Sequence, residues 1–275
     1  MAGSLDAGLS AEEKKNLFGN AYLNMLWHCK SDPRFHYWVH LPDQYFDEQN
    51  PRYQLMVIVQ HTGRTVEGYM RELKNISDKD HVALIAPVFP GGLVDDDDMN
   101  SYKLLSDAGV RYDLILLSMI EEMGRRYPGV QTDQVYMFGH SGGGQFANRF
   151  LLAHPERLKA VAIGAPGRPT FLNFQEKYFW GVKDFKAYFD KEIDLEAMKN
   201  VPVQLTVGEQ DTVFIGKSSY GCNRVERMRS LQKNFEEYGI QTTLKILPGL
   251  AHEGGDKERI LEAYHFFKPL IQKSS

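Results

Sequence analysis

A serine, an aspartate and a histidine stand at comparable places in this sequence, each soon after a short apolar run. Ser141 lies in GHSGG, Asp211 ends GEQD, and His252 lies in LAHEGG. A serine hydroxyl is a weak nucleophile until a neighbouring base takes its proton, and an acid must orient that base. If the fold brings the three together, these residue types would carry out nucleophilic acyl chemistry.

The glycines around Ser141 predict a sharp turn between a strand and a helix. Val135–Phe138 has the pattern of a strand, and a helical pattern follows the serine. Gly139 and Gly143, two residues before and two after, would let the two backbones approach closely. The same turn would place the amide of Gly142 at a helix N-terminus, where an N–H can stabilise an oxyanion. A glycine-rich turn without chemistry is the alternative.

The acid and the base have alternatives of their own. Glu209 stands closer to its strand than Asp211 and could replace it as the acid. His252 could be an ordinary surface histidine, although no other histidine lies between the last predicted strand and the last predicted helix. His140, the variable residue of the turn, is expected to pack.

Seven short runs rich in Val, Ile and Leu predict strands. The middle runs barely alternate between apolar and polar residues, which is typical of strands buried on both faces of a parallel sheet. The runs are Tyr37–Leu41, Gln54–Gln60, Val82–Val88, Val135–Phe138, Val161–Ala165, Val203–Val207 and Thr243–Leu247.

Helical patterns separate these runs. The alternation predicts an α/β fold, a mostly parallel, doubly wound sheet of about eight strands flanked by helices, in a single domain over residues 1–275. In such sheets ligands bind beyond the carboxyl ends of the strands, where Ser141, Asp211 and His252 would all lie. The predicted helices are Thr65–Leu73, Asp107–Arg126, Gly142–Ala153, Arg224–Tyr238 and Asp256–Ile271.

Two segments depart from this rhythm. Residues 1–30 are expected to form a helical extension that starts at Ser10, whose capping-box partner is Glu13. Its apolar stripe, which runs from Leu17 to Leu26, would pack on the flank of the sheet or form a dimer contact. Residues 165–200 hold eight aromatic residues in 36 positions, too long for a simple crossover and too aromatic for a disordered linker.

We interpret residues 165–200 as an inserted cap over the sheet. Phe174, Phe179 and Trp180 are candidate substrate contacts, with packing inside the cap as the alternative for each. Together they predict an apolar or aromatic lining for the pocket.

On the motifs GHSGG, GEQD and LAHEG, residues 37 to 272 resemble the α/β-hydrolase superfamily. The resemblance implies that Ser141 is the nucleophile, Asp211 the acid and His252 the base. The stretch VIVQHTGRT looks like the oxyanion loop of that superfamily. It implies that the amide of Thr62, or else of Gly63, is the second oxyanion donor beside Gly142.

Other residues near the expected site allow two interpretations each. His61 could contact substrate or make a structural hydrogen bond, and Arg64 could grip a carboxylate or anchor its loop. The run Asp95–Asp98 lacks the pattern of a calcium loop and is expected to be solvated. Tyr102 and Lys103 follow it and are candidates to face the site.

Composition limits the partners. The net charge of −4 offers no basic field for nucleic acid or for an anionic membrane surface. The longest apolar run, Val82–Phe89, is too short to span a membrane. The first residues do not read as a secretory signal, and Cys29 and Cys222 have no metal-ligand spacing. These features predict a cytoplasmic protein with free thiols.

These observations predict a serine hydrolase that cleaves a carboxylic ester, lactone or similar acyl bond of a small, partly apolar molecule. No metal or organic cofactor is expected. Three alternatives keep the same three residues or the same fold: a carbon–carbon bond hydrolase acting on a diketone, an acyltransferase or cyclase, and a non-catalytic ligand receptor.

Overall fold

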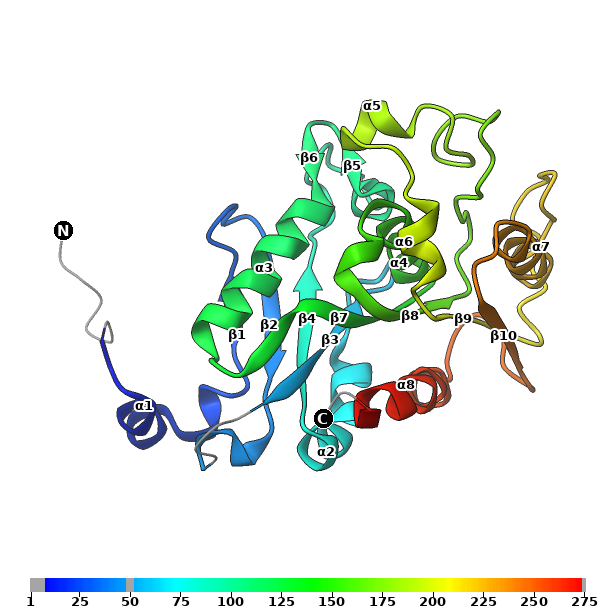
Figure 1. The fold of residues 1–275 in the computed structure, drawn as a ribbon. Helices are drawn as coiled ribbons and strands as arrows, with labels where there is room; N and C mark the ends of the chain where they lie inside the picture. The colour runs from blue at the N-terminus through cyan, green and yellow to red at the C-terminus, as the bar shows by residue number, and fades with distance from the viewer. Residues whose placement is uncertain (1–7, 48–51, 274–275) are drawn as a thin grey trace.

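Eight strands form one sheet in the computed structural model, which describes residues 8–47 and 52–273 (Figure 1). The spatial order is β1-β2-β4-β3-β7-β8-β9-β10. The pairs β1–β2 and β2–β4 are antiparallel, and all other neighbours are parallel, which confirms the predicted mostly parallel sheet. The strands are β1 Leu26–His28, β2 His36–His40, β3 Tyr53–Val59, β4 Val82–Val88, β7 Val130–His140, β8 Leu158–Gly164, β9 Val203–Gly208 and β10 Thr242–Leu247.

The middle strands are buried on both faces, as their continuous apolar runs predict. In β3 every residue is buried. Leu55, Val57 and Val59 belong to one hydrophobic cluster, whereas Met56 and Ile58 belong to another. Because side chains alternate along a strand, the two clusters lie on opposite faces of the sheet.

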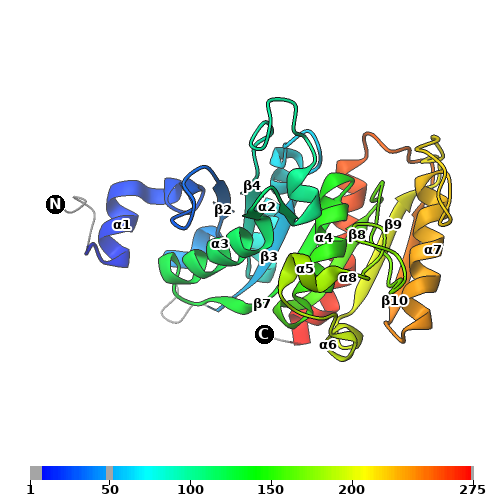
Figure 2. The ribbon, with the colours of Figure 1, turned by 90° about the horizontal axis from the view of Figure 1, so that it is seen from above.

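Helices cover both faces. The cluster around Met56 and Ile58 includes residues of α2 and α8, and the other includes residues of α3, α4 and α7. Figures 1 and 2 both show β10 and α7 at the end of the molecule opposite α1. Within the described residues, no helix has the combination of length and apolarity that a membrane crossing requires. The long helices are α2 Glu67–Asp80, α3 Tyr112–Arg126, α4 Gly142–Ala153, α7 Arg224–Glu237 and α8 Asp256–Lys273.

Helices α2 and α3 differ from their predicted limits by more than two residues. Helix α2 continues past Leu73 because Ser77 keeps the same buried face, and it ends only where His81 takes a left-handed conformation with φ 54°. Helix α3 starts later than predicted. A small hairpin of β5 (Ser106–Asp107) and β6 (Val110–Arg111) precedes it, and the two residues between these strands both have positive φ, as a tight hairpin turn requires.

The N-terminal helix α1, Ala11–Phe18, has the predicted capping box. The Ser10 side chain accepts from the Glu13 amide at 3.2 Å, and the Glu13 carboxylate accepts from the Ser10 amide at 2.7 Å. The predicted stripe to Leu26 is wrong, because the helix ends at Gly19 and Leu26 starts the edge strand β1. Residues 1–7 of the expected extension lie outside the described residues.

The aromatic segment 165–200 forms only two short helices, α5 (Phe185–Phe189) and α6 (Leu195–Lys199). It packs along α4, where every residue except Gln145 is buried. The amide of Thr170 donates to the Asn148 side chain at 2.7 Å, which fixes the start of the segment on α4.

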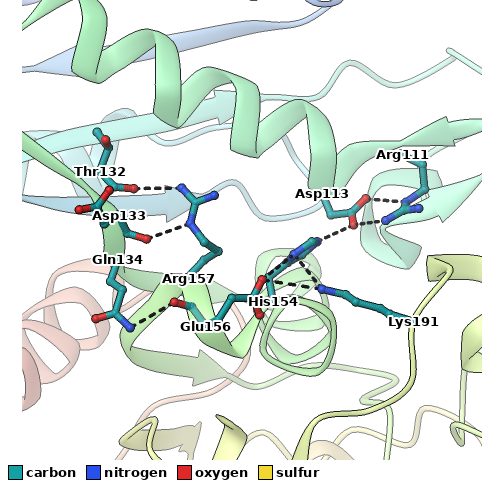
Figure 3. A network of polar contacts seen from close by, with 9 residues as sticks. All are labelled: Arg111, Asp113, Thr132, Asp133, Gln134, His154, Glu156, Arg157 and Lys191. Atoms are coloured by element: carbon teal, nitrogen blue, oxygen red, sulfur yellow. Dashed lines mark hydrogen bonds and ion pairs between the residues drawn. The ribbon is translucent and has the colours of Figure 1, made fainter.

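A polar network holds the other end of this segment near α3 and α4 (Figure 3). The buried Asp113 accepts two hydrogen bonds from Arg111 and lies 2.8 Å from His154 Nε2. Burial acts to raise the pKa of Asp113, but the hydrogen bonds from His154 and Arg111 outweigh it and hold the pKa below its usual value. Lys191 reaches the second ring nitrogen of His154 at 3.2 Å. His154 is therefore a structural residue.

Candidate active site

Ser141 lies on a strained turn between β7 and α4. Its φ of 55° and ψ of −112° lie outside the regions that non-glycine residues usually adopt. Its amide donates to the carbonyl of Gly164 on β8 at 2.8 Å. A Cβ on Gly139 would come within 2.2 Å of the Gly143 carbonyl oxygen, and one on Gly143 within 2.4 Å of the Val59 carbonyl oxygen. The flanking glycines are therefore required by close backbone contact.

The structure brings Ser141, His252 and Asp211 into one hydrogen-bonded chain. His252 Nε2 lies 2.9 Å from Ser141 Oγ, and His252 Nδ1 lies 2.6 Å from Asp211 Oδ2. The three side chains come from the loops after β7, β10 and β9, with β8 between the first of these strands and the other two. Asp211 is fully buried, so its charge acts on the imidazole with little screening by water.

Arg224, the first residue of α7, is the fourth residue of this hydrogen-bonded chain. It was not identified as a site residue from the sequence. Its Nη1 donates to Asp211 Oδ1 at 3.2 Å, so the carboxylate is held through both oxygens. Only its place at a helix start marked it in the sequence. Glu209, the alternative acid, accepts from the Gly249 amide at 3.0 Å instead of facing the histidine.

His140 contacts the backbone of the loop that carries His252. Its Nε2 lies 3.2 Å from the carbonyl oxygen of His252, and the two imidazole rings are 5.0 Å apart. Burial, followed by the charge of Arg259, places the pKa of His140 well below its usual value. The ring is therefore neutral at pH 7, and its Nε2–H donates to the carbonyl of His252.

Loop 60–64 is fixed beside the serine. The Gln60 side chain donates to the Phe89 carbonyl at 2.7 Å and accepts from the Phe89 amide at 3.2 Å, which joins the ends of β3 and β4. Tyr102 donates to the Gln60 carbonyl at 3.1 Å. Arg64 donates to the carbonyls of Thr62 and Phe89. These contacts anchor the loop, which is the second of the two roles considered for Arg64.

The same loop places Thr62 next to Gly142. A Cβ on Gly142 would lie 3.0 Å from Thr62 Oγ1, so the two residues are in contact at the start of α4. The amide of Gly63 donates to His61 Nδ1 at 3.0 Å and is therefore engaged within the loop. His61 Nε2 lies 2.7 Å from Thr65 Oγ1. The histidine thus bonds within its own loop and is not a lining residue of the cavity beside Ser141.

A cavity of about 340 Å³ opens at Ser141. Its lining is mostly polar and includes four cationic side chains, which corrects the prediction of an apolar or aromatic pocket. The lining residues are Thr62, Asn100, Lys103, Leu104, Ser141, Gln145, Gly167, Arg168, Phe179, Ile215, Arg224 and Arg227.

Of the three aromatic residues predicted to contact substrate, only Phe179 lines this cavity. Phe174 is 42% exposed and packs against Tyr238 at the end of α7, with ring centroids 5.8 Å apart. Trp180 stacks with Tyr220 at 6.1 Å. Phe174 therefore joins segment 165–200 to the end of α7, and Trp180 joins it to the loop that precedes α7. Neither ring lines the cavity.

The acidic run Asp95–Asp98 forms local turns. Asp95 accepts from the Asp97 amide at 3.1 Å, and Asp98 accepts from the Asn100 amide at 2.9 Å. In the described part of the chain, no group of three or more His, Cys, Asp or Glu side chains is arranged to hold a metal ion.

Comparison with known proteins supports the fold assignment. No family model matches the sequence, and no curated protein matches it. Among solved structures, the poly(3-hydroxybutyrate) depolymerase LpqC from Bordetella parapertussis is 18% identical, with a TM-score of 0.69 over 96% of this chain and 95% of that one. Poly(aspartic acid) hydrolase-1 from Sphingomonas sp. KT-1 is 17% identical, with a TM-score of 0.68 over 90% and 97%.

An S-formylglutathione hydrolase from Agrobacterium tumefaciens is 15% identical, with a TM-score of 0.58 over 92% of this chain and 95% of that one. At these identities the likeness concerns the overall fold. The chain therefore has the α/β-hydrolase fold.

Proposed function

We propose that this protein is a serine hydrolase that cleaves a carboxylic ester or a related acyl bond of a small molecule. The observation that carries the proposal is the chain of hydrogen bonds from Ser141 through His252 to the buried Asp211. Structural neighbours named as a ferulic acid esterase, a poly(3-hydroxybutyrate) depolymerase and an S-formylglutathione hydrolase support it.

In the first half of the reaction Ser141 Oγ attacks the acyl carbon while His252 Nε2 accepts the hydroxyl proton. Asp211 holds the imidazole with Nδ1 protonated and stabilises the cation that forms. The tetrahedral intermediate then expels the alcohol, which takes its proton from His252. The product is an acyl-enzyme on Ser141.

The oxyanion of that intermediate would be bound by the amides of Gly142 and Thr62. An N–H at the start of α4 also carries the positive end of the helix dipole. Loss of one such donor typically raises the barrier by about 3 kcal/mol. In the second half, water attacks the acyl carbon, gives a proton to His252, and releases the acid as Ser141 regains its hydrogen.

The direct test is covalent labelling with a fluorophosphonate, read by intact mass. One adduct on the native protein, none on Ser141→Ala and slow labelling of His252→Ala are expected. Ser31 is an exposed serine on the β1 side of the sheet. The variant Ser31→Ala is therefore the matched control and should label like the native protein.

Hydrolysis of a 4-nitrophenyl ester should follow the same order among the four proteins. Folded native protein that neither labels nor hydrolyses any ester would overturn the proposal. Transfer of the acyl group to an added alcohol with no free acid would instead identify an acyltransferase, and cleavage of diketones alone a carbon–carbon hydrolase.

A further inference from the structure

The cavity beside Ser141 is strongly positive. Lys103, Arg168, Arg224 and Arg227 all line it, and no carboxylate is among its lining residues. Arg224 pairs with the buried Asp211 behind the cavity wall, so its charge is largely offset. The other three charges have no such offset within the lining. A cavity with this excess of cations favours an anionic ligand.

Lys103 is the most confined of these charges. Its side chain is only 6% exposed, and its ammonium donates to the Asn100 side-chain oxygen at 2.7 Å. Burial first, and then the charge of Arg64, lowers the pKa of Lys103 to about 8. Asp98 and the Tyr102 ring, 6.0 Å from the ammonium, offset the cost of burying this charge only in part, because the pKa is still lowered. A carboxylate brought by a ligand would offset it further.

Arg168 presents a second charge from segment 165–200. Its own carbonyl accepts from Arg149 Nη2 at 2.7 Å, and the carbonyl of Gly167 accepts from Arg227. The backbone is thus fixed on both sides while the side chain stays exposed, beside the ring of Phe179 at 5.9 Å. A fixed backbone with a solvated guanidinium is suited to binding a carboxylate, which matches its planar fork.

Arg149 fixes the backbone at positions 103 and 168 relative to each other. It is fully buried in α4 and donates to the Lys103 carbonyl at 2.6 Å as well as to that of Arg168. The Lys103 side chain also lies against the serine turn, because a Cβ on Gly142 would come within 2.9 Å of Lys103 Cε. An anionic group of a substrate bound here would therefore be separated by only a few covalent bonds from the acyl group that Ser141 attacks.

We propose that the natural substrate carries a carboxylate close to its scissile acyl bond, and that Lys103 and Arg168 bind this carboxylate. The proposal rests on the hydrolase function proposed above. Lys103 and Arg168 would then select the substrate. The class of molecule they select is a monoester or an internal ester (a lactone) that keeps a free carboxylate.

The test compares esters that differ only in charge. One pair is 4-nitrophenyl hydrogen adipate and 4-nitrophenyl methyl adipate, with the carboxylate on the acyl part. The second pair places a free or methylated carboxylate on the phenol of a butyrate ester. At low salt and neutral pH, kcat/KM of the native protein should favour the charged member of at least one pair by roughly tenfold or more.

Arg168→Gln and Lys103→Met should each lower this preference, and the double variant should abolish it. Arg168→Glu should reverse it, and because this side chain is exposed the variant is expected to fold. Arg71→Gln is the matched control, because Arg71 is a 78% exposed arginine on α2 outside the cavity. It should keep the native preference.

The two proposals fail differently. If the native protein hydrolyses both members of both pairs equally, or if Arg168→Glu leaves the preference intact, the carboxylate proposal is wrong while the hydrolase proposal stands. If no ester is hydrolysed and no fluorophosphonate adduct forms, the hydrolase proposal has failed.

Discussion

Arg224 Nη1 lies 3.2 Å from Asp211 Oδ1, on the carboxylate oxygen that His252 does not use. The aspartate is thus held from two sides, by a cation and by the imidazole. Because Asp211 is fully buried, loss of the guanidinium would leave one of its oxygens without this partner. Arg224 is therefore a positioning residue for the histidine as well as part of the cavity wall.

Replacing Arg224 by Gln should lower kcat by roughly tenfold or more, because Asp211 gains freedom to rotate away from the imidazole. Arg224→Lys should recover part of the loss. Steady-state kinetics with the neutral adipate ester separates the two roles of the residue. A raised KM with unchanged kcat would mean that Arg224 acts only in the cavity wall.

The charge preference should depend on pH. The lowered pKa of Lys103, about 8, comes first from burial and then from Arg64, with Arg149 and Arg168 acting in the same direction and Asp98 against them. The ammonium is charged below this pH and loses its proton above it. The ratio of kcat/KM for the charged and neutral adipate esters should therefore be level near pH 6 to 7 and fall toward about pH 9.

Any change with pH that affects the hydrolysis of both esters alike cancels from this ratio. In Lys103→Met the ratio should be lower and level over the same range. A native ratio that rises with pH would contradict the assignment of Lys103 to carboxylate binding.

Arg149→Met should destabilise the protein by about 3 kcal/mol or more, since it leaves the carbonyls of Lys103 and Arg168 and the hydroxyl of Thr170 without their donor. Urea titration followed by circular dichroism measures the change. Arg149→Lys should rescue little, because an ammonium cannot reach three acceptors in the geometry of a guanidinium. Arg71→Met serves as the surface control and should change stability by less than about 0.5 kcal/mol.

Gly143→Ala should prevent formation of the serine turn. The new methyl group would lie 2.4 Å from the Val59 carbonyl oxygen, which belongs to a central strand and cannot move away. A loss of about 3 kcal/mol or more is expected, at the upper end of overpacking effects. Thermal melts measure the change in stability. Gly68→Ala on α2 is the control, because the nearest atom to the new methyl group is the end of the Asp256 side chain. This variant should be as stable as the native protein or more stable.

The sequence was enough to place Ser141, Asp211 and His252, because parallel strands end at one edge of a sheet and each residue follows such a strand. It was not enough for the cavity. Lys103 was a candidate to face the site and does line the cavity. Arg168 and Arg224 come from two other, distant segments, and no periodicity indicates that they converge on it. The aromatic pattern of segment 165–200 suggested a pocket lining, but most of those rings pack on α4, α7 or one another.

Local errors have equally physical causes. The predicted start of the third helix ran through Gly109, whose positive φ forms the β5–β6 turn. The N-terminal stripe crossed Gly19, where the helix ends, and Leu17 is consequently 65% exposed. In both places a glycine within an otherwise helical pattern marks a helix boundary: the start of α3 lies after Gly109, and α1 ends before Gly19.

The arginines that stabilise the cavity donate hydrogen bonds to the main chain. Arg149 and Arg227 bind the carbonyl oxygens of Lys103, Gly167 and Arg168, and a carbonyl is present whatever side chain the residue carries. Positions 103 and 168 can therefore change identity during evolution without loosening the scaffold or disturbing the serine. Related chains could share this framework and yet differ in the charge of the molecules they accept.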